Sequence, residues 1–151
     1  MIVKNKKMAF VVATPLTAKA FLFDFLEKLS ADNEVYLIAN FDQKLSEWDF
    51  GSVTKINVNI QRKISIKDDL QALQSLFSIF RTHKFDVVHS VTPKAGLLAM
   101  TASKLAGIEY RYHTFTGQVW ANNAGLSRVA LLNALTALGF SPELSNKYPF
   151  S

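Results

Sequence analysis

Three predicted strands of the sequence are each followed by a polar segment that is rich in hydroxyl side chains. These segments occupy residues 14–17 (Thr-Pro-Leu-Thr), 90–96 (Ser-Val-Thr-Pro-Lys-Ala-Gly) and 113–118 (His-Thr-Phe-Thr-Gly-Gln). The first two segments lead directly into predicted helices, whose free N–H groups and positive dipole end favour phosphate or sugar oxygens. These residue types therefore predict a site that binds an oxygen-rich ligand through hydrogen bonds.

Two residues of these segments point most directly to a ligand. Lys94 stands in the first turn of a predicted helix, where the dipole disfavours a cation, so a bound anion opposite it would explain its position. His113 ends a predicted strand and precedes a polar loop, a place suited to hydrogen-bonding a substrate. We expect both to belong to the site.

Several of the other residues have structural explanations that stay open. Thr14 and Thr92 could cap helices, and Gly96 could allow a helix to pack closely on the sheet. His89 lies within a predicted strand and is interpreted as a structural histidine. For His83, near a helix end, an interaction with the helix dipole is sufficient.

The predicted strands are short apolar runs separated by turn residues. A continuous rather than alternating run is typical of a strand buried on both faces, as in parallel sheets. The run at 8–13 is of this kind, and further strands are predicted at 34–39, 85–90 and 108–113, with a weaker one at 53–60.

The predicted helices lie between these strands, at 17–30, from Ser65 onward, at 94–106 before Gly107, and at 126–138. Ser65 and the carboxylate three residues later, Asp68, are typical of a helix start. The helix 17–30 has one apolar face formed by Leu22, Phe25, Leu26 and Leu29. The expected core stripe of the helix from Ser65 is Leu70, Leu73, Phe77 and Phe80.

Strands that alternate with helices predict an α/β fold, a Rossmann-like parallel sheet with helices on both faces and right-handed crossovers. In such sheets ligands bind outside the carboxyl ends of the strands, where the strand order reverses. With the usual order, strands 8–13 and 85–90 flank that crevice and strand 108–113 lies beside the latter. The three polar segments should therefore converge on one site.

Composition sets the class of protein. The chain has 151 residues, 49% of them hydrophobic and 19% charged, which favours a single globular domain. It has no cysteine, so disulfide scaffolds, thiolate metal sites and cysteine nucleophiles are excluded, and a cytoplasmic protein is compatible. A net charge of +5 suits anionic partners, although dispersed cations are usually solvated surface.

The sequence lacks the motifs of several common enzyme and ligand-binding classes. No G-x-G-x-x-G or G-x-x-x-x-G-K-[ST] follows the first predicted strand, and no G-x-S-x-G occurs. The three histidines are too scattered to suggest a metal site. Nucleic-acid binding is not expected, because no Arg/Lys cluster is interleaved with aromatic residues.

Two blocks of the sequence, 85–99 (FDVVHSVTPKAGLLA) and 112–121 (YHTFTGQVWA), strongly resemble family 4 glycosyltransferases, above all bacterial members that build lipid-linked surface polysaccharides. The resemblance runs from about residue 7 to residue 138. It implies the N-terminal half of a GT-B enzyme, in which two Rossmann-like domains face each other across a cleft without an essential metal. In that family this half mainly holds the acceptor, and the other half holds most of the nucleotide-sugar.

The resemblance also implies roles for particular residues. His113 matches the family's histidine near the transferred sugar, and we take it as the catalytic candidate. The implied reaction is a retaining transfer of a hexosyl-type sugar from a nucleotide-sugar to a lipid-linked or other saccharide acceptor. The residues that match the substrate-binding loops are Thr14, Pro15, Leu16, Thr92, Lys94, Ala95, Gly96, Thr114, Thr116 and Gly117.

The expected organisation is one domain over 1–140 and an irregular tail over 141–151, where we expect the chain to be truncated. Since the resemblance implies a second, donor-binding half, we expect the isolated chain to be inactive. The alternative is a non-catalytic Rossmann-like binding domain that docks onto a separate donor-binding chain. An unrelated flavodoxin-like binder would require both matching blocks to be coincidental.

Contact with the inner face of the plasma membrane is a further expectation. Six basic residues could meet anionic headgroups there: Lys4, Lys6, Lys7, Arg62, Lys63 and Lys67. Plain solubilising charge explains them equally well.

Overall fold

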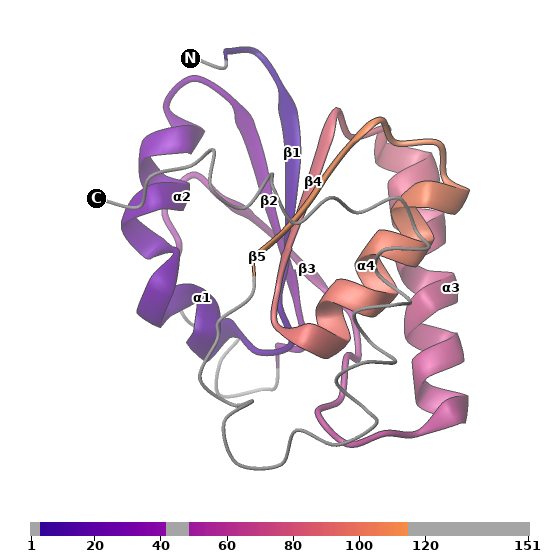
Figure 1. Cartoon of the computed structure of the whole chain (residues 1–151). Coiled ribbons are helices and arrows are strands. Elements are labelled where there is room, and N and C mark those ends of the chain that lie inside the picture. Colours follow the sequence, from indigo (N-terminus) through magenta and orange to yellow (C-terminus); the bar gives the residue numbers. More distant parts are fainter. Residues whose placement is uncertain (1–3, 42–48, 115–151) are drawn as a thin grey trace.

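The computed structural model describes residues 4–41 and 49–114, which form a five-stranded parallel sheet covered by helices on both faces (Figure 1). The strand order is β3-β2-β1-β4-β5. The strands are β1 (Lys7–Val11), β2 (Glu34–Ala39), β3 (Thr54–Asn57), β4 (Val87–Val91) and β5 (Tyr110–Thr114). The predicted fold class is confirmed, with β1 and β4 adjacent at the centre and β5 beside β4.

Four helices connect the strands: α1 (Pro15–Phe21), α2 (Phe23–Ser30), α3 (Ile66–His83) and α4 (Pro93–Leu105). Helices α1 and α2 cover one face of the sheet, and α3 and α4 cover the other (Figure 1). Each face has its own apolar core, because successive residues of a buried strand point to opposite sides. Phe10 and Leu37 pack with Leu26 on one face, while Val11 and Ile38 pack with Leu76 and Phe80 on the other.

The single helix predicted over 17–30 is wrong, since the structure has two helices separated at Leu22. The φ of Leu22 is −119°, far from the helical value near −63°. The helical hydrogen bonds nevertheless continue: the Leu22 N–H donates to Ala18 O, and the Leu26 N–H donates to Leu22 O. The chain bends at Leu22 while these two bonds are kept, and Leu22 and Leu26 are both buried.

Helix α3 begins where the sequence predicts but packs through a different set of residues. Ser65 is the N-cap, and its Oγ accepts a hydrogen bond from the Asp68 N–H at 3.4 Å. The predicted stripe is wrong at Leu70, which is 61% exposed, while Leu76 is fully buried and Ala72 nearly so. An 18-residue helix is about 27 Å long and a five-residue strand about 17 Å, so the first turns of α3 extend past the sheet (Figure 1).

The remaining boundaries shift by a few residues, and the strand predicted over 53–60 is the shorter β3. The helix predicted at 126–138, the tail 141–151 and the site residues Thr116 and Gly117 all lie outside the described residues. Within 4–41 and 49–114, no helix has the length and apolarity needed to cross a bilayer.

Candidate functional site

A cavity of about 430 Å³ lies at the carboxyl edge of the sheet, beside the ends of β1 and β4. Its walls come from one side of α1, the start of α4 and the loop between β3 and α3. The lining residues are Ala13, Thr17, Phe21, Arg62, Thr92, Pro93 and Lys94. The loops after the two central strands therefore converge there as the sequence predicts.

Thr92, the residue directly before α4, has a strained backbone conformation. Its φ is +87°, in a region that L-residues other than glycine rarely adopt. It occupies the N-cap position but its side chain makes no capping bond, and its buried Oγ1 has no hydrogen-bond partner among the described residues. Capping therefore does not explain Thr92. Strain of this kind, at a cavity with an unsatisfied hydroxyl, is typical of functional sites.

Thr14, the N-cap residue of α1, likewise makes no side-chain cap. Its Oγ1 lies 3.4 Å from the Oγ1 of Thr17, which lines the cavity. The two hydroxyls form a pair at the end of β1, so the capping interpretation of Thr14 also fails.

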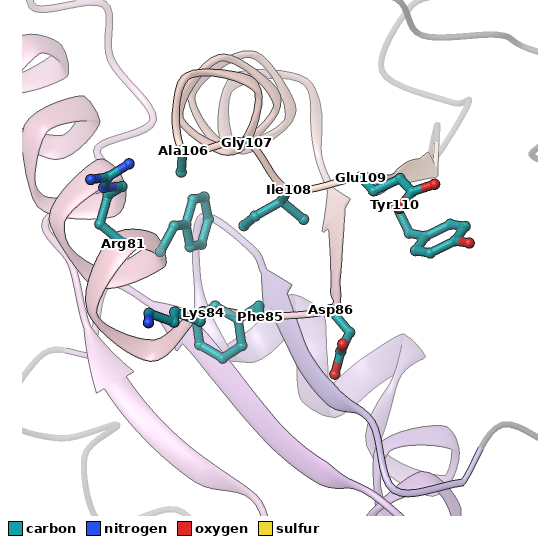
Figure 2. Close-up of a pocket in the computed structure, with 10 residues that line it drawn as sticks. Arg81, Lys84, Phe85, Asp86, Ala106, Gly107, Ile108, Glu109 and Tyr110 are labelled. Carbon is teal, nitrogen blue, oxygen red and sulfur yellow. The ribbon is translucent and has the colours of Figure 1, made fainter.

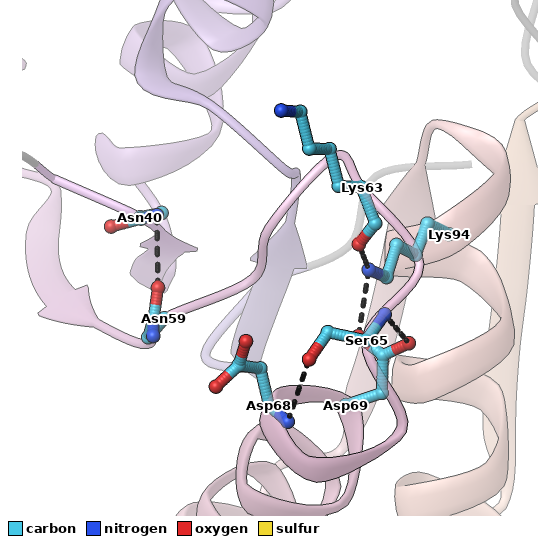
Figure 3. A network of polar contacts seen from close by, with 7 residues as sticks. All are labelled: Asn40, Asn59, Lys63, Ser65, Asp68, Asp69 and Lys94. Carbon is cyan, nitrogen blue, oxygen red and sulfur yellow. Dashed lines mark hydrogen bonds and ion pairs between the residues drawn. The ribbon is translucent and has the colours of Figure 1, made fainter.

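Lys94 fastens the β3–α3 loop onto the start of α4 (Figure 3). Its ammonium lies 2.7 Å from Asp69 Oδ1 and donates a hydrogen bond to the carbonyl of Lys63. Asp69 Oδ2 in turn accepts a hydrogen bond from the Ser65 N–H. In this arrangement the anion opposite Lys94 is Asp69.

Arg62 is the cavity's exposed cation. Its side chain makes no ion pair with any residue in the described part of the chain, and it stands beside Lys63, whose carbonyl Lys94 holds. Together with the N–H groups that begin α4, it gives the cavity a positive wall suited to a phosphate or another anion.

His113 lies directly behind the start of α4. Its Nδ1 shares a 2.8 Å hydrogen bond with Ser90 Oγ, and the side chain is buried. A Cβ placed on Gly96 would lie 2.3 Å from His113 Cε1. Close packing, one of the two explanations for Gly96, is therefore what the structure shows, and its neighbour is the histidine.

Burial keeps both strand histidines neutral. Desolvation lowers the pKa of His113 from 6.5 to about 4, against a hydrogen bond to the Ser90 backbone that acts to raise it. Desolvation and the nearby His113 lower the pKa of His89 to about 4 as well. His89 Nε2 shares a 2.7 Å hydrogen bond with Thr114 Oγ1 and its ring packs on Phe10, which confirms a structural place for it. A neutral His113 can exchange hydrogen bonds but carries no charge to offer an anion.

We expect Gly96→Ala to lower the free energy of unfolding by about 1–3 kcal/mol, because the added methyl group overlaps the buried ring of His113. Urea denaturation followed by circular dichroism measures the change. In a His113→Ala background the collision is absent, so the same replacement should be neutral or stabilising, as alanine favours a helix over glycine. An equal loss in both backgrounds would place the conflict elsewhere.

A second cavity, of about 450 Å³, lies at the opposite edge of the sheet (Figure 2). Arg81, Lys84, Asp86, Glu109 and Tyr110 are among its lining residues. It is formed where α3 and α4 end, at Lys84 and Ala106, and the negative dipole ends of helices disfavour anions. The carboxyl-edge cavity is therefore the candidate functional site.

Comparison with known proteins identifies bacterial relatives. The chain is 38% identical over 56 residues to the UDP-Gal:alpha-D-GlcNAc-diphosphoundecaprenol alpha-1,3-galactosyltransferase of Escherichia coli, a match that covers 37% of this chain and 14% of that protein. It is 24% identical over 132 residues to the capsular polysaccharide biosynthesis glycosyltransferase CapM of Staphylococcus aureus, covering 82% of this chain and 34% of that protein. The chain is a homologue of bacterial glycosyltransferases.

Solved structures place this glycosyltransferase homologue in the GT-B architecture. MurG of Acinetobacter baumannii superposes with a TM-score of 0.57 at 14% identity, over 85% of this chain and 39% of that one. A UDP-N-acetylglucosamine 2-epimerase superposes with a TM-score of 0.56 at 16% identity, over 93% of this chain and 45% of that one. No family model matches the chain. The chain spans between about a seventh and a third of the length of the two sequence relatives.

The predicted site residues that the structure describes, in this glycosyltransferase homologue, fall into three groups. Thr92 and Lys94 line the cavity, and Thr14 contacts it through Thr17. Gly96 and His113 lie behind its α4 wall. Four others line no part of the cavity: Pro15 and Ala95 are buried, Leu16 is exposed and Thr114 contacts His89.

Five residues that line the cavity are not among the predicted site residues: Ala13, Thr17, Phe21, Arg62 and Pro93. Thr17 belongs to the first polar segment, so its position after a predicted strand is the signal that points to it. Arg62 follows the weakest predicted strand. The carboxyl ends of all strands in a parallel sheet meet at one edge, where ligands bind, so the loop that contains Arg62 is a candidate for the site like the other loops.

Proposed function

We propose that this chain forms the acceptor-side half of a glycosyltransferase that moves a sugar from a nucleotide-sugar donor to a lipid-linked saccharide. The observation that carries the proposal is the cavity at the carboxyl edge, with the strained Thr92, the exposed cation of Arg62 and the start of α4 on its walls. The names of the two relatives supply the reaction class: one acts on a GlcNAc-diphosphoundecaprenol and the other in capsular polysaccharide biosynthesis.

In this proposal Arg62 and the α4 N–H groups hold the anionic part of the acceptor, and the hydroxyls of Thr17 and Thr92 hold sugar oxygens. His113 is buried behind α4, so in this proposal it positions the start of that helix and does not touch the sugar, which departs from the catalytic role that the family resemblance implies. The transfer retains the configuration of a hexosyl-type sugar, as the family resemblance implies. The reaction takes place on the inner face of the plasma membrane.

The donor's diphosphate needs a second half to hold it, in the same polypeptide or in a separate chain. Transition-state stabilisation needs cations or N–H donors at the departing diphosphate, and in this proposal Arg62 and the α4 N–H groups already bind the acceptor. We therefore propose that these 151 residues alone transfer little or no sugar.

Binding of a soluble acceptor analogue tests the site. A short-chain prenyl-diphosphate-GlcNAc titrated into the chain by calorimetry should bind saturably, and Arg62→Ala should weaken it about tenfold or more, as expected for a hydrogen bond to a charged group. Arg81→Ala is the matched control, since Arg81 lines the opposite-edge cavity. Absence of binding, or equal loss in both variants, would refute the site. Robust turnover of UDP-sugars by the chain alone would refute the need for a second half.

A further inference from the structure

Helix α1 presents two rows of side chains to different surroundings. Ala18 and Leu22 are four positions apart, and both are buried in the core between the helix and the sheet. Thr17 and Phe21 are also four positions apart, and both line the cavity at the carboxyl edge. One side of α1 is therefore a cavity wall, in which a hydroxyl group and an aromatic ring lie one helical turn apart.

Phe21 differs in exposure from the other phenylalanines that the structure describes. Its side chain is 68% exposed, whereas every other phenylalanine in 4–41 and 49–114 is buried or half-buried. A single exposed apolar side chain is common on protein surfaces. Phe21, however, lies on the wall of a cavity, and aromatic side chains in such walls commonly contact ligands. Its ring is therefore a surface that a ligand in the cavity can cover.

The groups around Phe21 match the outline of a pyranose sugar. A pyranose has C–H groups on the faces of its ring and hydroxyl groups around the rim. The face of an aromatic ring is electronegative, so it attracts C–H groups that carry a partial positive charge. Thr17 and Thr92 offer hydroxyl groups to the oxygens of the rim, and Arg62 offers a guanidinium to a neighbouring phosphate.

An alkyl chain fits the same groups less well. It would cover the ring of Phe21, but it would also remove Thr17 and Arg62 from water without giving them a hydrogen-bond partner, which costs free energy. Thr92 Oγ1 is already buried without a partner among the described residues, and a sugar hydroxyl can supply one. A saccharide is therefore the occupant that these groups favour.

We propose that Phe21 is a specificity-determining residue, and that the sugar of the acceptor stacks on the face of its ring. This role rests on the proposed function and deepens it. Arg62 binds the anionic part of the acceptor, and Phe21 selects an acceptor that carries a sugar beside that anion.

Calorimetric titration with two soluble probes tests this role. One probe is a short-chain prenyl-diphosphate-GlcNAc, and the other is the same prenyl diphosphate without a sugar. Phe21→Leu removes the ring but keeps an apolar side chain, so it should weaken binding of the first probe about fivefold or more and that of the second by less than about twofold. Phe21→Tyr keeps the ring and should bind both probes like the unmodified chain. The exposure of Phe21 lets the fold accept both replacements.

NMR spectroscopy of the bound sugar gives a second measurement. Protons above the face of an aromatic ring are shielded, so the ring C–H resonances of bound GlcNAc should move upfield, and this shift should disappear in Phe21→Leu. Tyr110→Leu is the matched control, because Tyr110 is a 52% exposed aromatic residue that lines the opposite-edge cavity. It should change neither the affinities nor the upfield shift. Absence of the shift in the unmodified chain would overturn the proposal.

The two probes also separate this role from the proposed function. Equal weakening of both probes in Phe21→Leu would overturn the stacking role and assign Phe21 to the prenyl chain. If Arg62→Ala weakens both probes while Phe21→Leu changes neither, the proposed function stands and the stacking role is wrong. If neither probe binds the unmodified chain, the proposed function fails, and Phe21 has no acceptor sugar to select.

Discussion

Leu76→Ala should lower the free energy of unfolding by about 2–5 kcal/mol, whereas Leu70→Ala, six residues earlier on the same helix, should change it by no more than about 0.5 kcal/mol. Leu76 has no exposed surface and packs in the core between α3 and the sheet, so truncation leaves a cavity that the neighbouring side chains do not fill. Leu70 stands on the turns of α3 beyond the sheet, 61% exposed, and loses few contacts.

Urea denaturation of both variants, followed by the helical signal in circular dichroism, measures this difference. The pair is well matched because the residue type, the helix and the substitution are the same. A loss at Leu70 comparable with that at Leu76 would show that Leu70 belongs to the core, as the spacing of apolar residues in the sequence predicts.

Acid should unfold the domain through His89 and His113. Both have a pKa of about 4 in the folded chain, lowered from 6.5 by desolvation, so each binds its proton more readily when unfolded. Their contribution is fully present above about pH 6.5 and is lost as the pH falls toward 4. At 1.36 kcal/mol per pH unit each, the loss approaches about 3 kcal/mol per histidine, a large part of the 5–15 kcal/mol typical of a domain.

Urea midpoints between pH 7.5 and 5 would measure this slope, and NMR titration of the two imidazoles would assign it. In His113→Gln one titrating group is gone, so the slope between pH 6.5 and 5 should fall to about half. The slope is compared rather than the absolute stability, because the replacement also alters the hydrogen bond to Ser90. An unchanged slope would mean that His113 has the same pKa in the folded and the unfolded chain.

Much of the fold could be predicted from local chemistry. The buried strands, the Ser65 cap, the end of α4 near Gly107 and the meeting of the loops after β1 and β4 all follow from patterns within a few residues. The bend at Leu22 could not be predicted, because Leu22 and Leu26 have the apolar spacing of one continuous helix and are both buried.

The errors in the site and the core have tertiary causes. Leu70 has the spacing of a core residue, and it is exposed because α3 is longer than the strands it covers, which depends on the whole sheet. Arg62 reaches the cavity because the Lys94–Asp69 pair and the Lys63 carbonyl hold its loop against α4. That pair joins residues 25 positions apart, a distance at which periodicity carries no information.

The central position of β1 has a consequence for how the chain folds. Met8 of β1 pairs with Val35 on one side and with Val87 on the other, 27 and 79 residues away in sequence. Pairings this distant in sequence give a high contact order, which slows folding. During synthesis, one edge of β1 stays unpaired until β4 has been made. Before β4 is present, the nascent β1–β2 pair exposes the unpaired backbone N–H and C=O groups of an apolar strand. An exposed strand edge of this kind favours aggregation.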